Sequence, residues 1–179
     1  MVHYNFAENF RAIYDRAVAL YGQGQRGTGT YFSKAETDFL AANGITPQHI
    51  YDYAEDHNNY GEPGFEIALT IEMVRRDYFL NVQNGRPSEL TVDPGTWPAK
   101  TDIIKGVEWL PRILPKARAK LRGELPASVM YPCGGDRAFF TANDIHPAEF
   151  LNLVWRMGDN DEALIDWVVH RQGKRSTTA

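Results

Sequence analysis

The chain has 179 residues and a net charge of −4, with 43% hydrophobic and 23% charged residues. This length can bury a core without disulfides, as one large domain or two small ones. The acidic balance argues against nucleic acid as a partner, and no apolar run approaches the ~20 residues of a membrane span. A single cysteine excludes an intrachain disulfide framework and fits a reducing compartment. We therefore expect a cytoplasmic protein with no membrane partner.

The hydrophobic pattern predicts an all-α fold, because apolar residues recur at helical spacing along most of the chain. Local start signals support it: Ser33 and Glu36 have the spacing of a capping box, and Pro47 stands at a first helical position. In chain order, the expected helices cover residues 5–21, 34–43, 47–57, 65–82, 104–122, 136–143, 147–157 and 161–171.

The two halves of the chain align without gaps at an offset of 100 residues. Five identities fall close together, where Phe39, Ala42, Asn43, Ile45 and Pro47 match Phe139, Ala142, Asn143, Ile145 and Pro147. The alternative is that unrelated helix-turn-helix segments look alike, since both need an apolar end, a stop residue and a proline start. We favour an internal duplication, with two related helical units packed into one compact body.

The repeat sets the expected domain organisation. A first helical unit is expected over residues 1–83, a Pro- and Gly-rich linker over 84–100 and a second helical unit over 101–173. The polar end of the chain, residues 174–179, is expected to be a disordered tail. Residues that differ between the two copies are better functional candidates than the shared ones.

Charge is sorted between the two halves. Residues 35–74 hold eight acidic residues and no Lys or Arg, whereas residues 100–122 hold seven basic residues and two acidic ones. In the basic helix, the apolar positions predicted to face the core are Leu110, Ile113, Leu114, Ala117 and Leu121.

The cations of this helix allow three interpretations. Arg112, Lys116 and Lys120 form a stripe at i, i+4 spacing, and the simplest interpretation is a solvated face. A second is an anion pocket, because Arg side chains bind carboxylate or phosphate in bidentate fashion. A third is docking against the acidic half, within a chain or across a homodimer.

Two segments carry a resemblance to a known family: WLPRILPKARAKLRG, which begins at Trp109, and YPCGGDRAFF, which begins at Tyr131. They resemble the uncharacterised bacterial family catalogued as domain of unknown function 5069, and the match is best from about residue 104 to 170. The resemblance implies where a site would lie, but it implies no activity, cofactor or substrate.

Cys133 is the candidate catalytic residue, as a nucleophile or redox group. It directly precedes a predicted helix, and a helix N-terminus with nearby cations makes a thiol more nucleophilic. The alternative is an inert buried cysteine. Asp136 is expected either to cap that helix or to orient a neighbouring arginine.

A metal site is not expected. His49, Asp52 and Asp56 would share one face of a helix, but no fourth ligand with characteristic spacing is evident. We also expect no cofactor, since the chain has neither a P-loop nor a Rossmann glycine pattern.

The sequence therefore favours a protein that binds a small anionic molecule, with an enzyme using Cys133 and a protein-interaction module as alternatives. Whether it catalyses a reaction, which ligand it binds and whether it forms a homodimer are left open. The residues expected to form the ligand site are Arg112, Lys116, Arg118, Tyr131, Asp136 and Arg137.

Overall fold

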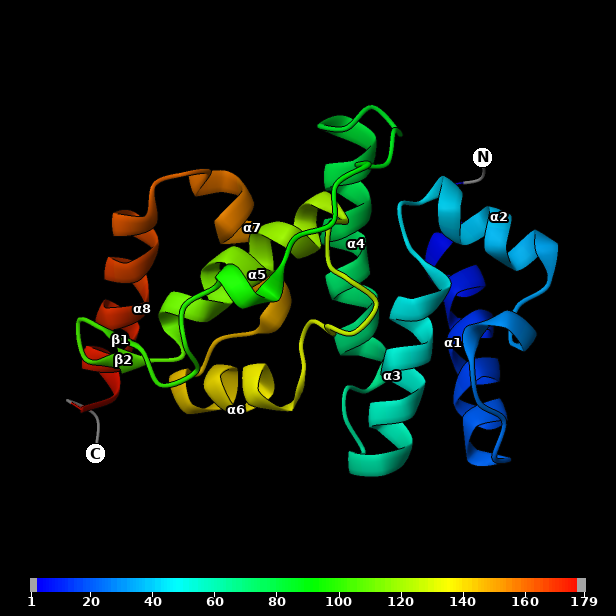
Figure 1. Ribbon diagram of the computed structural model, residues 1–179, viewed down its shortest axis with the longest axis horizontal. Helices are drawn as coiled ribbons and strands as arrows, with labels where there is room; N and C mark the ends of the chain where they lie inside the picture. The colour runs from blue at the N-terminus through cyan, green and yellow to red at the C-terminus, as the bar shows by residue number, and fades with distance from the viewer. Residues whose placement is uncertain (1–2, 177–179) are drawn as a thin grey trace. The chain divides into compact units, whose positions relative to one another are not determined.

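The computed structural model describes residues 3–176, with side chains described as far as Gln172. These residues divide into two units, which meet in the chain between Pro87 and Ser88. Both units are mostly α-helical, so the predicted helical fold class is confirmed in its main feature (Figure 1). None of the described helices is both long and apolar enough to cross a membrane.

The first unit consists of four α-helices and one short 3-10 turn, Thr28–Thr30. α1 packs against α3 and α4, and its buried face includes Phe10, Tyr14 and Ala17. The helices of this unit are α1 (Phe6–Gly22), α2 (Lys34–Ala42), α3 (Pro47–Tyr60) and α4 (Phe65–Asn81).

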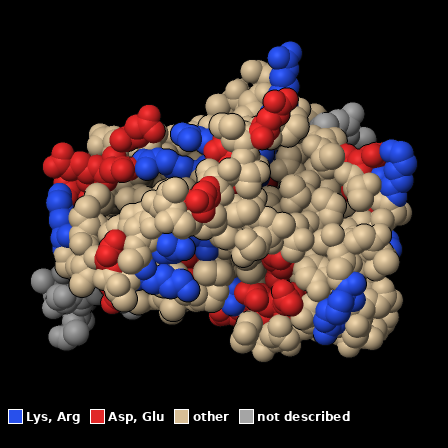
Figure 2. All heavy atoms as spheres, viewed as in Figure 1, with Lys and Arg blue, Asp and Glu red and all other residues tan. Residues whose placement is uncertain are grey.

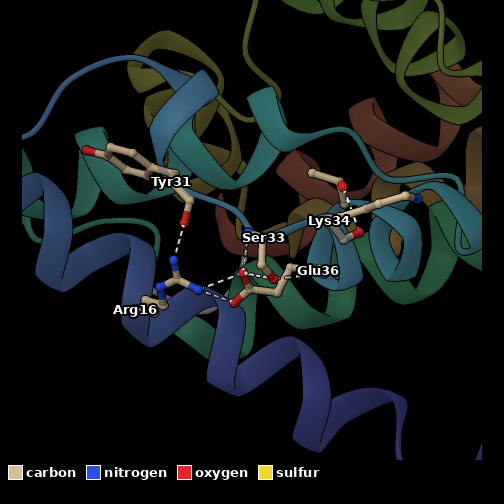
Figure 3. A network of polar contacts seen from close by, with 6 residues as sticks. Arg16, Tyr31, Ser33, Lys34 and Glu36 are labelled. Carbon is tan, nitrogen blue, oxygen red and sulfur yellow. Dashed lines mark hydrogen bonds and ion pairs between the residues drawn. The ribbon is translucent and has the colours of Figure 1, made fainter.

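The start of α2 confirms the predicted capping box. The Ser33 hydroxyl accepts the Glu36 backbone N–H, and the Glu36 carboxylate accepts the Ser33 backbone N–H at 2.7 Å. Both carboxylate oxygens of Glu36 also accept from one nitrogen, Nη1, of Arg16 in α1, each at 2.6 Å. Because Arg16 further donates to the Tyr31 carbonyl at 2.8 Å, one guanidinium ties α1 to the loop and start of α2 (Figure 3).

This contact predicts a pH dependence for the first unit. Burial alone would raise the pKa of Glu36, but the hydrogen bonds from Ser33 and Arg16 outweigh it, and the net pKa is lowered. A carboxylate with a lowered folded pKa adds stability above its ordinary pKa, and this stability is lost as pH falls through the folded value.

We therefore expect Glu36→Gln to destabilise the first unit by about 1–2 kcal/mol at pH 7, through the weakened cap and ion pair. The difference from the parent protein should shrink as pH falls below about 4.5, the ordinary pKa of the carboxylate, and should vanish once pH has fallen through the lowered folded pKa. Hydrogen exchange of the α1 and α2 amides at pH 7 and pH 4 would measure the difference in stability between the variant and the parent protein. Equal differences at both pH values would contradict the expectation.

The second unit consists of four α-helices, a 3-10 turn and a small antiparallel two-stranded sheet. The 3-10 turn, Pro94–Thr96, lies in the segment that precedes the sheet. The remaining elements are β1 (Ile103–Ile104), β2 (Val107–Glu108), α5 (Leu110–Arg122), α6 (Gly134–Asn143), α7 (Pro147–Met157) and α8 (Asp161–Ser176).

The sheet corrects the prediction of a purely α-helical chain and of a helix beginning near residue 104. Ile104 pairs with Val107, and the two residues between them, Lys105 and Gly106, have φ values of 48° and 82°. A two-residue hairpin loop of type I′ has positive φ at both central residues, and glycine adopts positive φ without steric cost. The Lys-Gly turn therefore connects the two strands of a hairpin, and the helix begins only at Leu110.

A strap formed by residues 88–98 lies along α5. At one end, Ser88 and Val92 donate to the side chain and the carbonyl of Glu124, both at 2.9 Å. At the other end, Arg112 donates to the Pro98 carbonyl at 2.7 Å. Much of the segment expected to be a linker is therefore fastened to the second unit. At the far end of the chain, α8 continues to Ser176, and the rest of the predicted tail lies outside the described residues.

The core-facing positions predicted for the basic helix are all buried in α5, which confirms the apolar face of this helix. Two of its cations, Lys116 and Lys120, are buried as well. The simple interpretation of their stripe as a solvated face is therefore wrong. A buried ammonium group needs a polar partner, and for Lys116 that partner identifies the candidate site.

Candidate functional site

The candidate site lies where the middle of α5 meets the N-terminus of α6. Cys133 occupies the N-cap position of α6, and its side chain is partly exposed. Lys116 projects from α5, and its Nζ lies 3.1 Å from the Cys133 Sγ. A thiol at a helix N-terminus beside a cation is the environment in which cysteines become reactive.

Asp136 connects the parts of the site. One of its oxygens, Oδ2, accepts from Lys116 Nζ at 2.5 Å and from the Cys133 backbone N–H at 2.9 Å. The other, Oδ1, accepts from the Trp109 indole N–H at 3.0 Å. Asp136 is the third residue of α6, so the prediction that it is the N-cap residue is wrong by three positions. It acts from inside the helix, where its carboxylate reaches back to the N-cap backbone.

The Lys116–Asp136 pair is removed from water. The side chains are 6% and 0% exposed, respectively. Burying two charges costs desolvation free energy, which their attraction offsets only when the remaining hydrogen bonds are satisfied. The indole N–H of Trp109 and the backbone N–H of Cys133 satisfy two further lone pairs of Asp136, which helps to hold the pair in one geometry.

Trp109 is the member of this cluster that sequence reasoning did not identify as a site residue. Its backbone is in the left-handed region, with φ of 70°, and it immediately precedes α5. The indole lies against Gly135, where an added Cβ would be 2.4 Å from Trp109 Cζ2. No local pattern marks this role, because a tryptophan beside an amphipathic helix is usually a core residue.

Two of the predicted ligand residues point away from this cluster. Arg112 donates to the Pro98 carbonyl, and its guanidinium lies 5.5 Å from the centre of the Trp97 ring. Arg118 donates to the Gly158 carbonyl at 2.9 Å and forms an ion pair with Asp161. They diverge because six residues correspond to about 240° around a helix. The structure therefore brings Lys116, and neither of these arginines, to Asp136.

The two remaining predicted residues lie close to the start of α6. Arg137 donates from Nη1 to the Pro132 carbonyl at 2.9 Å, and its Nη2 would be 3.9 Å from a Cβ added at Gly134. Tyr131 is buried, and its hydroxyl donates to the Pro147 carbonyl at 2.9 Å. Burial and the nearby Asp136 charge raise the pKa of Tyr131 well above its ordinary value, so its phenol stays neutral. Tyr131 thus supports the start of α7.

The charges of the second unit form local pairs. Lys105 pairs with Asp166 and Arg171 pairs with Glu149, in addition to the pairs of Lys116 and Arg118. On the face drawn in Figure 2, acidic side chains accordingly stand beside basic ones over this unit. Among residues 3–172, no group of three or more His, Cys, Asp and Glu side chains could hold a metal ion.

Comparison with known proteins adds one finding. Residues 99–179 match the model of the family described as Domain of unknown function (DUF5069), which confirms the resemblance of this segment. No curated protein and no solved structure matches the chain.

Proposed function

We propose that the segment matching this family model, residues 99–179, binds a small anionic molecule at the N-terminus of α6, beside the Cys133 thiol. The observation that carries the proposal is the position of Lys116, whose buried ammonium contacts both Asp136 and the partly exposed thiol. The family description names no activity, so the proposal rests on the geometry of the site.

The start of α6 offers hydrogen-bond donors to an anion. The first N–H groups of a helix have no partner within the helix, and its N-terminus carries a partial positive charge. Gly134 is exposed and has no side chain, so a ligand can approach the backbone closely. Arg137, one turn further on, adds a guanidinium beside Gly134. The proposed ligand residues accordingly keep Lys116 and Arg137 from the expected set and add Cys133 and Gly134.

A second candidate function, an enzyme that uses Cys133 as nucleophile or redox group, is favoured by the 3.1 Å separation of Lys116 Nζ and Cys133 Sγ. An adjacent cation and a helix N-terminus both favour the thiolate, which is the reactive form of a cysteine. The two candidates are compatible, because a bound anionic electrophile would lie next to the nucleophile.

Alkylation with two reagents of similar size separates the two candidates. Iodoacetamide is neutral and reports thiol reactivity alone, whereas iodoacetate is anionic and also reports attraction of an anion. We expect Cys133 to react with iodoacetamide faster than glutathione does. We also expect its iodoacetate-to-iodoacetamide rate ratio to exceed that of glutathione about tenfold, from roughly one charge-assisted hydrogen bond. Since the chain has one cysteine, the rates need no assignment.

One variant and one change of conditions provide the controls for the alkylation experiment. Arg137→Gln should lower the rate ratio toward that of glutathione while leaving the iodoacetamide rate nearly unchanged. Added salt should lower the ratio in the parent protein, because it screens the exposed part of the attraction. A parent ratio equal to that of glutathione would rule out the anion site, and an iodoacetamide rate no faster than that of glutathione would rule out the reactive thiol.

We also propose that the two units arose by internal duplication. In support, α2 begins at Lys34 and α6 at Gly134, and prolines begin α3 and α7 at positions 47 and 147. The side chains of Asn43 and Asn143 donate to carbonyls four residues earlier in the chain, at 2.7 and 2.8 Å. Equivalent contacts at one fixed offset are expected of copies and are not required of two unrelated helix pairs.

A further inference from the structure

Both units fasten their second helix by the same kind of contact. In the first unit Arg16 of α1 binds Glu36 of α2, and in the second Lys116 of α5 binds Asp136 of α6. Each acid is the third residue of its helix and accepts the N-cap backbone N–H. The cation, the N-cap residue and the acid each differ by 100 positions between the units, so the first unit shows the contact in its simple form (Figure 3).

The two contacts differ sharply in exposure to water. Side-chain exposure is 46% for Arg16 and 20% for Glu36, but 6% for Lys116 and 0% for Asp136. In the first unit both carboxylate oxygens face the guanidinium. In the second unit one oxygen takes the ammonium and the other takes the indole N–H of Trp109. The extra donor is thus specific to the second unit, where the thiol lies.

The conformation of Trp109 is energetically unfavourable in itself. In the alignment at an offset of 100, the residue equivalent to Trp109 is Asn9, which is exposed on α1. Trp109 instead holds a positive φ of 70°, which costs a non-glycine residue about 1 kcal/mol or more. Its indole also requires a glycine at position 135, where any Cβ would overlap the ring. Close packing and the hydrogen bond to Asp136 together offset the strained backbone.

We infer that Trp109 is a positioning residue for the Cys133 site, an inference that rests on the proposed function. The indole N–H fixes Asp136, and Asp136 in turn holds the Lys116 ammonium beside the Cys133 sulfur. The ring also covers the first turn of α6 at Gly135. Trp109 acts through Asp136 and Lys116 and needs no contact with a ligand.

The variant Trp109→Phe tests this inference, because it keeps an aromatic ring over Gly135 and removes only the N–H donor. We expect its iodoacetamide rate at neutral pH to fall about tenfold, as for loss of one hydrogen bond to a charged group. Its pH profile of alkylation should also differ from that of the parent protein, a change that a purely structural role would not produce. Trp97→Phe is the matched control, since the Trp97 ring lies beside Arg112 and should leave rate and profile unchanged.

A second variant covers the outcome in which Trp109→Phe fails to fold. Gly135→Ala retains the indole but pushes it away from Asp136, so it should slow alkylation in the same direction. If folded Trp109→Phe, or Gly135→Ala in its place, alkylates at the parent rate with the parent profile, the inference is overturned while the proposed function stands. If the parent thiol itself reacts no faster than glutathione, the hypothesis of a reactive Cys133 is rejected, and the inference about Trp109 is rejected with it.

Discussion

Replacing Asp136 by alanine is expected to destabilise the second unit by about 3–5 kcal/mol, the range found when one partner of a buried ion pair is removed. The substitution leaves the Lys116 ammonium in a dry site without its carboxylate. It also leaves the Trp109 indole N–H and the Cys133 backbone N–H without their acceptor. Urea unfolding followed by tryptophan fluorescence would measure the loss, because all four tryptophans belong to the second unit.

Two further variants control this experiment. Asp166→Ala removes a carboxylate from a pair with Lys105 whose side chains are 43% and 58% exposed, and it should cost less than about 1 kcal/mol. The double variant Asp136→Ala with Lys116→Met should recover part of the lost stability, since it removes the unpaired charge. If Asp136→Ala costs no more than Asp166→Ala, the buried pair does not hold α6 to α5.

Gly135→Ala and Gly134→Ala are expected to change stability in opposite directions, although they are neighbours in the first turn of α6. At Gly135 the new Cβ would lie 2.4 Å from the Trp109 ring, so the indole must move, at a cost of about 1–3 kcal/mol. At Gly134 the nearest atom is an Arg137 nitrogen at 3.9 Å, which is ordinary contact. There the substitution should stabilise by a few tenths to about 1 kcal/mol, because alanine favours the helix over glycine.

The same urea experiment measures both variants, and each serves as the control for the other. Trp109→Ala should abolish the difference between them, because it removes the ring against which the Cβ at position 135 collides. Equal effects of the two substitutions in the parent protein would show that Trp109 does not pack on the first turn of α6.

Much of the helical framework was predictable, because the signals that begin and end helices are local. Ser33 with Glu36 marks the start of α2, and Pro47 and Pro147 mark the starts of α3 and α7. The apolar face of α5 was also predictable from its spacing. The hairpin at residues 103–108 was missed, because two short strands carry little periodicity and only the Lys105-Gly106 pair marks the turn.

The candidate site was predictable in part. Cys133, Lys116 and Asp136 were named from the sequence, and the structure brings these three together. Arg112 and Arg118 were named with them, but they bind carbonyls of other segments. Charge at helical spacing indicates a basic helix, yet it does not indicate which cation finds a carboxylate and which finds a backbone oxygen.

The sequence by itself determined most of the helix positions, the capping box of α2 and the apolar face of α5, since each depends on residues within about one turn. Only the tertiary structure decided that Lys116 is buried against Asp136 and that Trp109 completes the cluster. These contacts join residues 20 and 27 positions apart. Such contacts form only after α5 and α6 have packed, and their strength depends on the exclusion of water that this packing produces.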